Sequence, residues 1–129
     1  MRIVRLGSTW RVVEIAEGRE YCLELLALEN GYSVSNVSAA LGCSQRYLHV
    51  TFMRDIGLSP KRWMRYERMV LARRKLEGGL SPEEVADHLG FAGLHSFRRE
   101  FQEFHKVSPV KFQRDRQVFD PSLFEEIDG

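Results

Sequence analysis

The chain has 129 residues and two cysteines, Cys22 and Cys43, which are too few for a disulfide framework and lack neighbours at metal-ligand spacing. No apolar run reaches the length of a membrane span and the basic start lacks the features of a signal peptide, so we expect a cytoplasmic protein with no metal and no cofactor. The net charge of +1 divides into −1 over residues 1–30, +6 over residues 31–116 and −4 over residues 117–129, which indicates a nucleic-acid surface followed by an acidic tail.

Residues 1–32 form the first segment, an N-terminal extension that ends in a helix. Short apolar runs on both sides of Gly7-Ser8-Thr9 predict a small hairpin over residues 1–16. From Glu17 to Glu29, apolar side chains that include Tyr21 and Leu25 recur at helical spacing, and Asn30-Gly31 supply an ending. We therefore expect the first helix to cover residues 17–29.

Residues 33–58 carry two shorter helices on either side of a glycine turn. Ser33 is a suitable N-cap for a helix through Leu41, and Gly42-Cys43 turn the chain into Ser44, a second N-cap. The next helix is expected from Gln45 to about Asp55, and Gly57 allows a left-handed exit. A short helix, a tight turn and a second helix outline a helix-turn-helix.

Residues 59–78 predict one long connecting helix, with Ser59 as N-cap, Pro60 at its first position and Gly78-Gly79 at its end. Its length is about 27 Å at 1.5 Å per residue. One side is apolar and the remainder is mostly Lys and Arg; the apolar positions are Trp63, Met69, Ala72 and Leu76.

Residues 79–116 repeat the helix-turn-helix pattern. Ser81-Pro82-Glu83-Glu84 is a capping box, and Val85 and Leu89 follow Val37 and Leu41 by 48 positions. After one inserted residue the offset is 49, which pairs Phe97 with Leu48 and Phe101 with Phe52. The last segment, residues 117–129, is an acidic tail, for which both disorder and weak docking stay open.

The two predicted recognition helices carry basic residues on one side. A recognition helix packs one face on its own core and turns the other to the bases, so base-facing residues are out of phase with the apolar ones. The outward residues are Gln45, Arg46, His49, Val50 and Met53 in the first helix, and His95, Arg98, Arg99 and Gln102 in the second. Arg46 and Arg99 suit the O6 and N7 atoms of guanine. A plain solvated helix face is the alternative, but clustering on two equivalent helices favours DNA.

Several segments together resemble one family. They are Ala40-Leu41-Gly42-Cys43-Ser44 with Tyr47-Leu48, Phe52 to Pro60, Glu67-Arg68-Met69 with Ala72-Arg73, Val85-Ala86, Leu89-Gly90-Phe91, Phe97 to Phe101, and Val107-Ser108-Pro109. Residues 33–114 resemble the DNA-binding domain of AraC-type transcriptional regulators. The resemblance implies an all-α fold of about seven helices, in which two helix-turn-helix units joined by a long connecting helix enter successive major grooves of duplex DNA.

The resemblance also implies base-facing residues: Arg46, His49 and Val50 in the first unit, and Leu94, His95, Ser96 and Arg99 in the second. The full set that we assign to DNA binding is Ser44, Gln45, Arg46, His49, Val50, Leu94, His95, Ser96, Arg98 and Arg99. The second unit departs from the family pattern, because Gly93 replaces a capping Asp, Lys106 replaces a glycine, and His95-Ser96 reverses the usual order. We therefore expect a less firmly capped second recognition helix.

The function predicted from the sequence is sequence-specific binding of double-stranded DNA in transcription regulation, without enzyme activity. RNA polymerase is a further candidate partner, and neither a membrane nor a small-molecule site is expected, because the chain is too short to include the family's ligand-sensing domain. Two alternatives stay open. One is a protein-interaction module with the same fold, and the other is a domain of a DNA-repair methyltransferase, which needs an alkyl-accepting cysteine in a more suitable place than Cys43.

Overall fold

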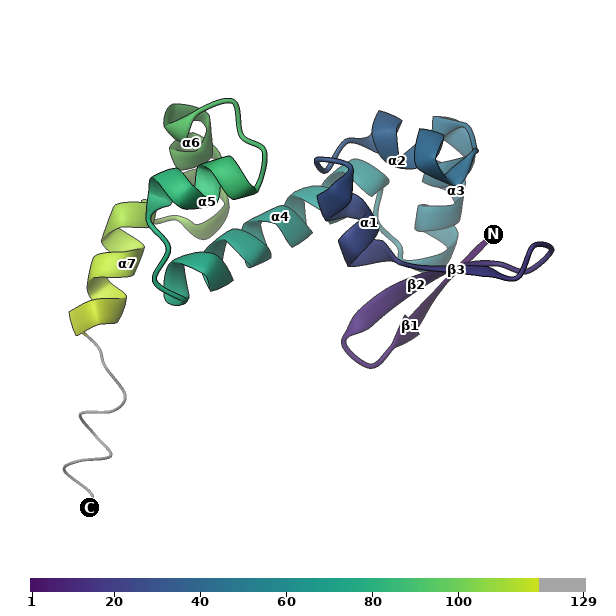
Figure 1. Ribbon diagram of the computed structural model, residues 1–129, viewed down its shortest axis with the longest axis horizontal. Helices are drawn as coiled ribbons and strands as arrows, with labels where there is room; N and C mark the ends of the chain where they lie inside the picture. The colour runs from purple at the N-terminus through teal and green to yellow at the C-terminus, as the bar shows by residue number, and fades with distance from the viewer. Residues whose placement is uncertain (119–129) are drawn as a thin grey trace, which may run out of the picture. The chain divides into compact units, whose positions relative to one another are not determined.

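The computed structural model describes residues 1–118, and it is mostly helical with a small sheet at its N-terminal end (Figure 1). The elements in chain order are β1 (Arg2–Leu6), β2 (Thr9–Glu14), β3 (Arg19–Cys22), α1 (Leu23–Glu29), α2 (Val34–Leu41), α3 (Gln45–Asp55), α4 (Pro60–Glu77), α5 (Pro82–His88), α6 (Leu94–His105) and α7 (Pro109–Val118). The prediction of seven helices is confirmed. The prediction of an all-α fold with a small N-terminal hairpin is confirmed only in part, because the N-terminal segment forms a three-stranded sheet.

Two compact units divide the chain, one formed by Met1–Arg68 and the other beginning at Met69. The first half of α4 therefore belongs to the first unit and its second half to the second unit. As the sequence predicts, the apolar positions of α4 are buried, with Trp63 in the first core and Met69, Ala72 and Leu76 in the second.

The N-terminal sheet is antiparallel with the strand order β1-β2-β3. Ile3 pairs with Val12, and Val12 pairs with Tyr21. The predicted hairpin corresponds to β1 and β2, but β3 was not predicted, since residues 17–22 were assigned to a helix. Gly18 adopts a left-handed conformation (φ +64°), which turns the chain back so that β3 can pair with β2. As a result α1 begins only at Leu23, and Leu25, which was expected on the inner face, is 51% exposed.

In the first unit, the sequence predicted the helix-turn-helix closely. The Ser33 Oγ accepts a hydrogen bond from the N–H of Asn36 (3.2 Å), and the Ser44 Oγ accepts one from the N–H of Tyr47 (3.1 Å). Gly42 ends α2 in the left-handed region at φ +68°. Phe52 of α3 packs edge-on against Trp63 of α4, with ring centroids 5.8 Å apart. These contacts fix α3 with one side in the core.

In the second unit, α5 begins with the predicted capping box, in which Ser81 and Glu84 exchange hydrogen bonds. Phe97 and Phe101 of α6 are fully buried, and the ring of Phe101 contacts that of Phe112 on α7 at a centroid distance of 6.0 Å. The side-chain amide of Gln113 donates hydrogen bonds to the carbonyls of Leu76 (3.1 Å) and Leu80 (2.7 Å). Thus α7 closes the core around α6.

Within residues 1–118, no helix has the length and apolar character required to cross a bilayer. The same residues contain no cluster of three or more His, Cys, Asp or Glu side chains that could hold a metal ion. Residues 119–129, most of the predicted acidic tail, lie outside the described residues, so the alternatives for the tail stay predictions.

Candidate nucleic-acid interface

The exposed side of α3 carries the residues that the sequence analysis assigned to DNA in the first unit. Burial of Leu48, Thr51 and Phe52 sets the rotation of the helix. The opposite side exposes Gln45, Arg46, His49, Val50 and Met53. Val50 and Met53 are apolar, yet 54% and 46% of their surfaces are exposed. Ser44 is exposed too, but its hydroxyl already accepts the N–H of Tyr47, so it acts first as a cap.

The exposed side of α6 is more polar. Phe97 and Phe101 are buried, and His95, Arg98, Arg99 and Gln102 are exposed. Two residues of the predicted set are less accessible, because Leu94 and Ser96 are half-buried. The Ser96 hydroxyl also donates a hydrogen bond to the carbonyl of Gly93 (2.9 Å). We therefore place the main candidate contacts of α6 at His95, Arg98 and Arg99.

Each helix presents positive charge on its own exposed side. Neither α3 nor α6 has an acidic residue in its first turn, so the partial positive charge of the helix N-terminus is not cancelled locally. The exposed guanidinium groups of Arg46, Arg98 and Arg99 add to this charge. A surface of this kind favours phosphate groups, and arginine can also bind guanine through two parallel hydrogen bonds.

The ends of α6 are built differently from those of α3, as the sequence indicated. Gly93, at the N-cap, is extended and has no side chain to accept a hydrogen bond. Lys106, at the C-cap, is left-handed at φ +63°, a conformation that costs a non-glycine residue about 1–2 kcal/mol. In α3 the corresponding residues are Ser44, whose side chain caps the helix, and Gly57, which is left-handed at φ +89°.

The N-terminal sheet is fastened to α3 by a contact that the sequence analysis missed. The Asp55 carboxylate accepts hydrogen bonds from the N–H of Ile3 (2.8 Å) and from Arg54 (2.8 and 2.9 Å). Arg54 also donates to the carbonyl of Met1 (2.9 Å). The hydrogen bond from Arg54, followed by that from Ile3, lowers the pKa of Asp55 to about 2 despite its burial. One feature of the sequence pointed to this contact. The helix-turn-helix repeat breaks at Arg54-Asp55, because the second unit has Glu103-Phe104 at the equivalent positions.

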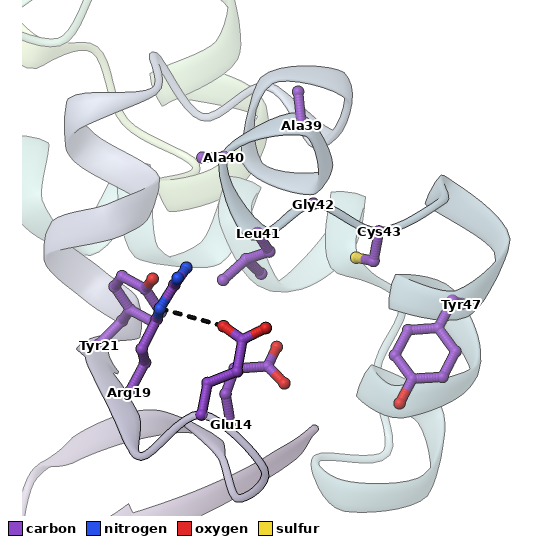
Figure 2. A pocket seen from close by; sticks show the side chains of 10 residues that line it. Glu14, Arg19, Tyr21, Ala39, Ala40, Leu41, Gly42, Cys43 and Tyr47 are labelled. Carbon is purple, nitrogen blue, oxygen red and sulfur yellow. Dashed lines mark ion pairs between the residues drawn. The ribbon is translucent and has the colours of Figure 1, made fainter.

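Figure 2 shows a pocket at the place where the sheet meets the helix-turn-helix turn. Glu14, Arg19 and Tyr21 line it from the sheet side, and Leu41 to Cys43 and Tyr47 line it from the other side. The Arg19 guanidinium is paired with Glu17 at 3.1 Å. Burial and the nearby Glu14 raise the pKa of the Cys43 thiol, so its reactive thiolate form is disfavoured. Cys43 thus fits the role of a small residue in the turn better than that of an alkyl acceptor.

Comparison with known proteins adds sequence relatives. The family model described as "Helix-turn-helix domain" matches residues 37–115. The Msm operon regulatory protein of Streptococcus mutans is 29% identical over 85 residues, which are 65% of this chain and 31% of that protein. The uncharacterized HTH-type transcriptional regulator YidL of Escherichia coli is 32% identical over 84 residues, 64% of this chain and 28% of that protein. The match therefore spans about a third of the length of these relatives.

A solved structure adds a nucleic-acid complex to the comparison. The chain resembles the DNA-binding domain of AdpA, described as a global transcriptional factor, whose crystal structure was determined in complex with a target DNA. The TM-score is 0.67 and the identity is 25%, with 83% of this chain and 96% of that chain covered.

Proposed function

Because the chain belongs to the AraC-type helix-turn-helix family, we propose that it binds duplex DNA sequence-specifically and regulates transcription, with α3 and α6 each entering a major groove. The observation that supports this most directly is the repeated construction of the two helices. Each buries two large apolar residues on one side and exposes arginine and histidine on the other. That division into a core-facing and a base-facing side is what a recognition helix requires.

The residues of α3 suggest what the first unit reads. Arg46 lies in the first turn, where a guanidinium can bind O6 and N7 of guanine together. Val50 lies one turn further along the same side, and its exposed apolar surface suits the methyl group of thymine. We assign contacts with neighbouring bases or phosphates to Gln45 and His49, and the N-terminal end of the helix, capped by Ser44, suits a phosphate.

The residues of α6 suggest a different set of contacts in the second unit. Arg99 is the candidate guanine reader, and His95 and Arg98 are candidates for base or phosphate contacts. Leu94 and Ser96 are half-buried, so we assign them supporting contacts at the edge of this surface.

The test is selection of bound sequences from a pool of random duplexes. We expect enrichment of one composite site with a guanine in each half, and a steep decrease in binding as the salt concentration rises. A double variant, Arg46→Ala with Arg99→Ala, serves as control, because both side chains are exposed and the fold should persist. This variant should keep weak binding to any duplex and enrich no site. If the wild-type chain enriches nothing above the starting pool, the proposed function is wrong.

Replacing thymine by deoxyuridine in the enriched site then tests the role of Val50, because the exchange removes only the methyl group. The wild-type chain should bind the thymine site more tightly, and Val50→Ala should bind the two duplexes equally.

A further inference from the structure

The hairpin formed by β1 and β2 has a net positive charge, although the segment that contains it does not. Arg2, Arg5 and Arg11 fall within the first thirteen residues, and the first acidic residue is Glu14. With Glu14, the last residue of β2, the net charge over residues 1–14 is +2, while the charge of −1 over residues 1–30 comes from glutamates further along. The hairpin therefore differs in charge from the rest of the N-terminal segment.

The start of this hairpin lies against α3, beside the side of the helix that is exposed. The Ile3 N–H donates to Asp55, and the Met1 carbonyl accepts from Arg54 (2.9 Å). Arg54 follows Val50 by four residues, so the two side chains are neighbours on the helix surface. In Figure 1 the N-terminal end of β1 is drawn next to α3. The start of the hairpin thus adjoins the exposed side of α3 at its Arg54 edge.

Two of the three arginines of the hairpin are available to another molecule. Arg2 is exposed, and its charge interacts with the Asp55 carboxylate without forming a hydrogen bond or ion pair within the described chain. Arg5 is exposed as well, lies over the Trp10 ring at 5.3 Å, and donates from Nε to the carbonyl of Gly7 (3.2 Å). These contacts hold the Arg5 side chain in place and leave its terminal nitrogens to other acceptors. Arg11 differs, since it is half-buried and lies 3.8 Å from Glu20.

We propose that the β1–β2 hairpin binds phosphate groups of duplex DNA next to the bases read by α3, through Arg2 and Arg5. The proposal rests on the proposed function, because it places the hairpin contact on the same duplex. Charge complementarity and continuity with the α3 surface support it. Arginine binds phosphate through paired hydrogen bonds, and phosphate contacts position a protein without reading sequence. The hairpin therefore adds affinity and lengthens the bound site without changing the base preference.

The experiment compares the wild-type chain with the double variant Arg2→Gln, Arg5→Gln on two versions of the selected site. One duplex continues for about one helical turn beyond the half-site read by α3, and the other ends at that half-site. We expect the wild type to bind the longer duplex several-fold more tightly and the double variant to bind both nearly equally. On the longer duplex, the slope of log affinity against log salt should fall by about 0.9 for each lost contact, or by about 2 in all.

The matched control is Arg19→Gln, which removes an exposed arginine from β3 of the same sheet and should leave the salt slope unchanged. The hairpin contact would be overturned if the wild type and the double variant had equal salt slopes and lost the same affinity when the duplex is shortened. In that case Arg46→Ala would still lose its base preference, which separates this result from failure of the proposed function. If no site is enriched at all, the same variants are compared on one mixed-sequence duplex, where an unchanged slope again contradicts the proposal.

Discussion

The two recognition helices have the same scaffold and different exposed sides. Phe97 and Phe101 of α6 stand 49 positions after Leu48 and Phe52 of α3, and all four are fully buried. At the same offset, the exposed Arg46 corresponds to His95, and the apolar Val50 corresponds to Arg99. The arginine therefore lies in the first turn of α3 and one turn later in α6. The comparison shows that the core positions are apolar and buried in both helices while the outward positions differ, so we expect the two helices to read unlike half-sites.

The residues at the ends of α3 and α6 also differ. In α3, Ser44 caps the N-terminal end, Gly57 takes the left-handed position, and Asp55 binds the sheet. Their equivalents at α6 are Gly93, Lys106 and Phe104. The last turn of α6 is held differently, since the His105 ring packs at a tilt against the Phe101 ring, with centroids 4.4 Å apart, and its Nε2 is hydrogen-bonded to the Met69 carbonyl at 3.0 Å. Side-chain hydrogen bonds thus secure the ends of α3, whereas ring contacts and the His105 hydrogen bond secure the last turn of α6.

The largest expected effect is on DNA binding. Arg46→Ala and Arg99→Ala should each weaken binding to the selected site by about 1–3 kcal/mol, because each removes a bidentate contact to guanine. Arg46→Ala should lose base preference only in the half-site read by α3, and Arg99→Ala only in the half-site read by α6. The affected base should occupy a different position within each half-site. Affinities for the selected site and for sites altered in one half provide the measurement. Loss in the same half for both variants would contradict the assignment of one helix to each half.

The next effect concerns the sheet contact, which only the first unit has. Asp55→Ala should lower the free energy of unfolding by about 1–3 kcal/mol, because it leaves the buried N–H of Ile3 without its acceptor. The pKa of Asp55 is about 2 in the folded chain and 3.8 ordinarily, so its carboxylate stabilises the fold above about pH 4. This contribution should be lost as the pH falls from 4 to 2.

Urea unfolding at neutral pH and near pH 3 measures both parts of this prediction. The free energy of unfolding of Asp55→Asn should not show the additional decrease that the wild type shows between pH 4 and pH 2, since the amide does not titrate. Identical pH dependence in the wild type and in Asp55→Asn would show that this carboxylate does not fasten the sheet to α3.

A smaller effect is expected at the left-handed positions that follow the helices. Lys106→Gly should stabilise the chain by about 1 kcal/mol, and Gly57→Lys should destabilise it by a similar amount, because only glycine adopts this conformation without steric cost. A Cβ at Gly57 would meet no atom within 4 Å, so the cost would be conformational. Equilibrium unfolding of the two exchanges measures this. Equal effects of the same sign would show that the two positions are not equivalent.

The sequence predicted those features that depend on residues close together in the chain. The N-caps at Ser33, Ser44 and Ser81 and the glycine turn at Gly42 follow from local rules, and α3 has the bounds that were expected. The duplication also located both recognition helices and their core-facing sides. The actual DNA contacts of the exposed residues stay predictions.

The features that the sequence did not predict depend on distant partners. Strand β3 forms because Arg19–Cys22 pair with β2, although the local pattern favours a helix. The contact between Ile3 and Asp55 joins residues 52 positions apart, which no local pattern reveals. The reduced exposure of Leu94 and Ser96 likewise depends on how α6 packs in its unit.

The smallest expected effect is at the N-cap of α6, where the two units differ by one side chain. Gly93 is extended at φ −174°, a conformation open to any residue, and a Cβ there would meet no atom within 4 Å. In Gly93→Ser the new hydroxyl should therefore accept the N–H of Ser96, as the Ser44 hydroxyl accepts that of Tyr47 in α3. The gain should be about 0.5 kcal/mol, partly from the cap and partly from the reduced freedom of the unfolded chain.

Hydrogen exchange separates these two contributions to the Gly93→Ser effect. If the cap forms, the Ser96 amide should exchange more slowly in the variant than in the wild type, and the melting temperature should rise by a few degrees. The reverse exchange, Ser44→Gly, should speed exchange of the Tyr47 amide and lower the melting temperature by a similar amount. A rise in melting temperature without protection of Ser96 would mean that the gain comes from the unfolded chain alone, and that α6 cannot be capped in the way that α3 is.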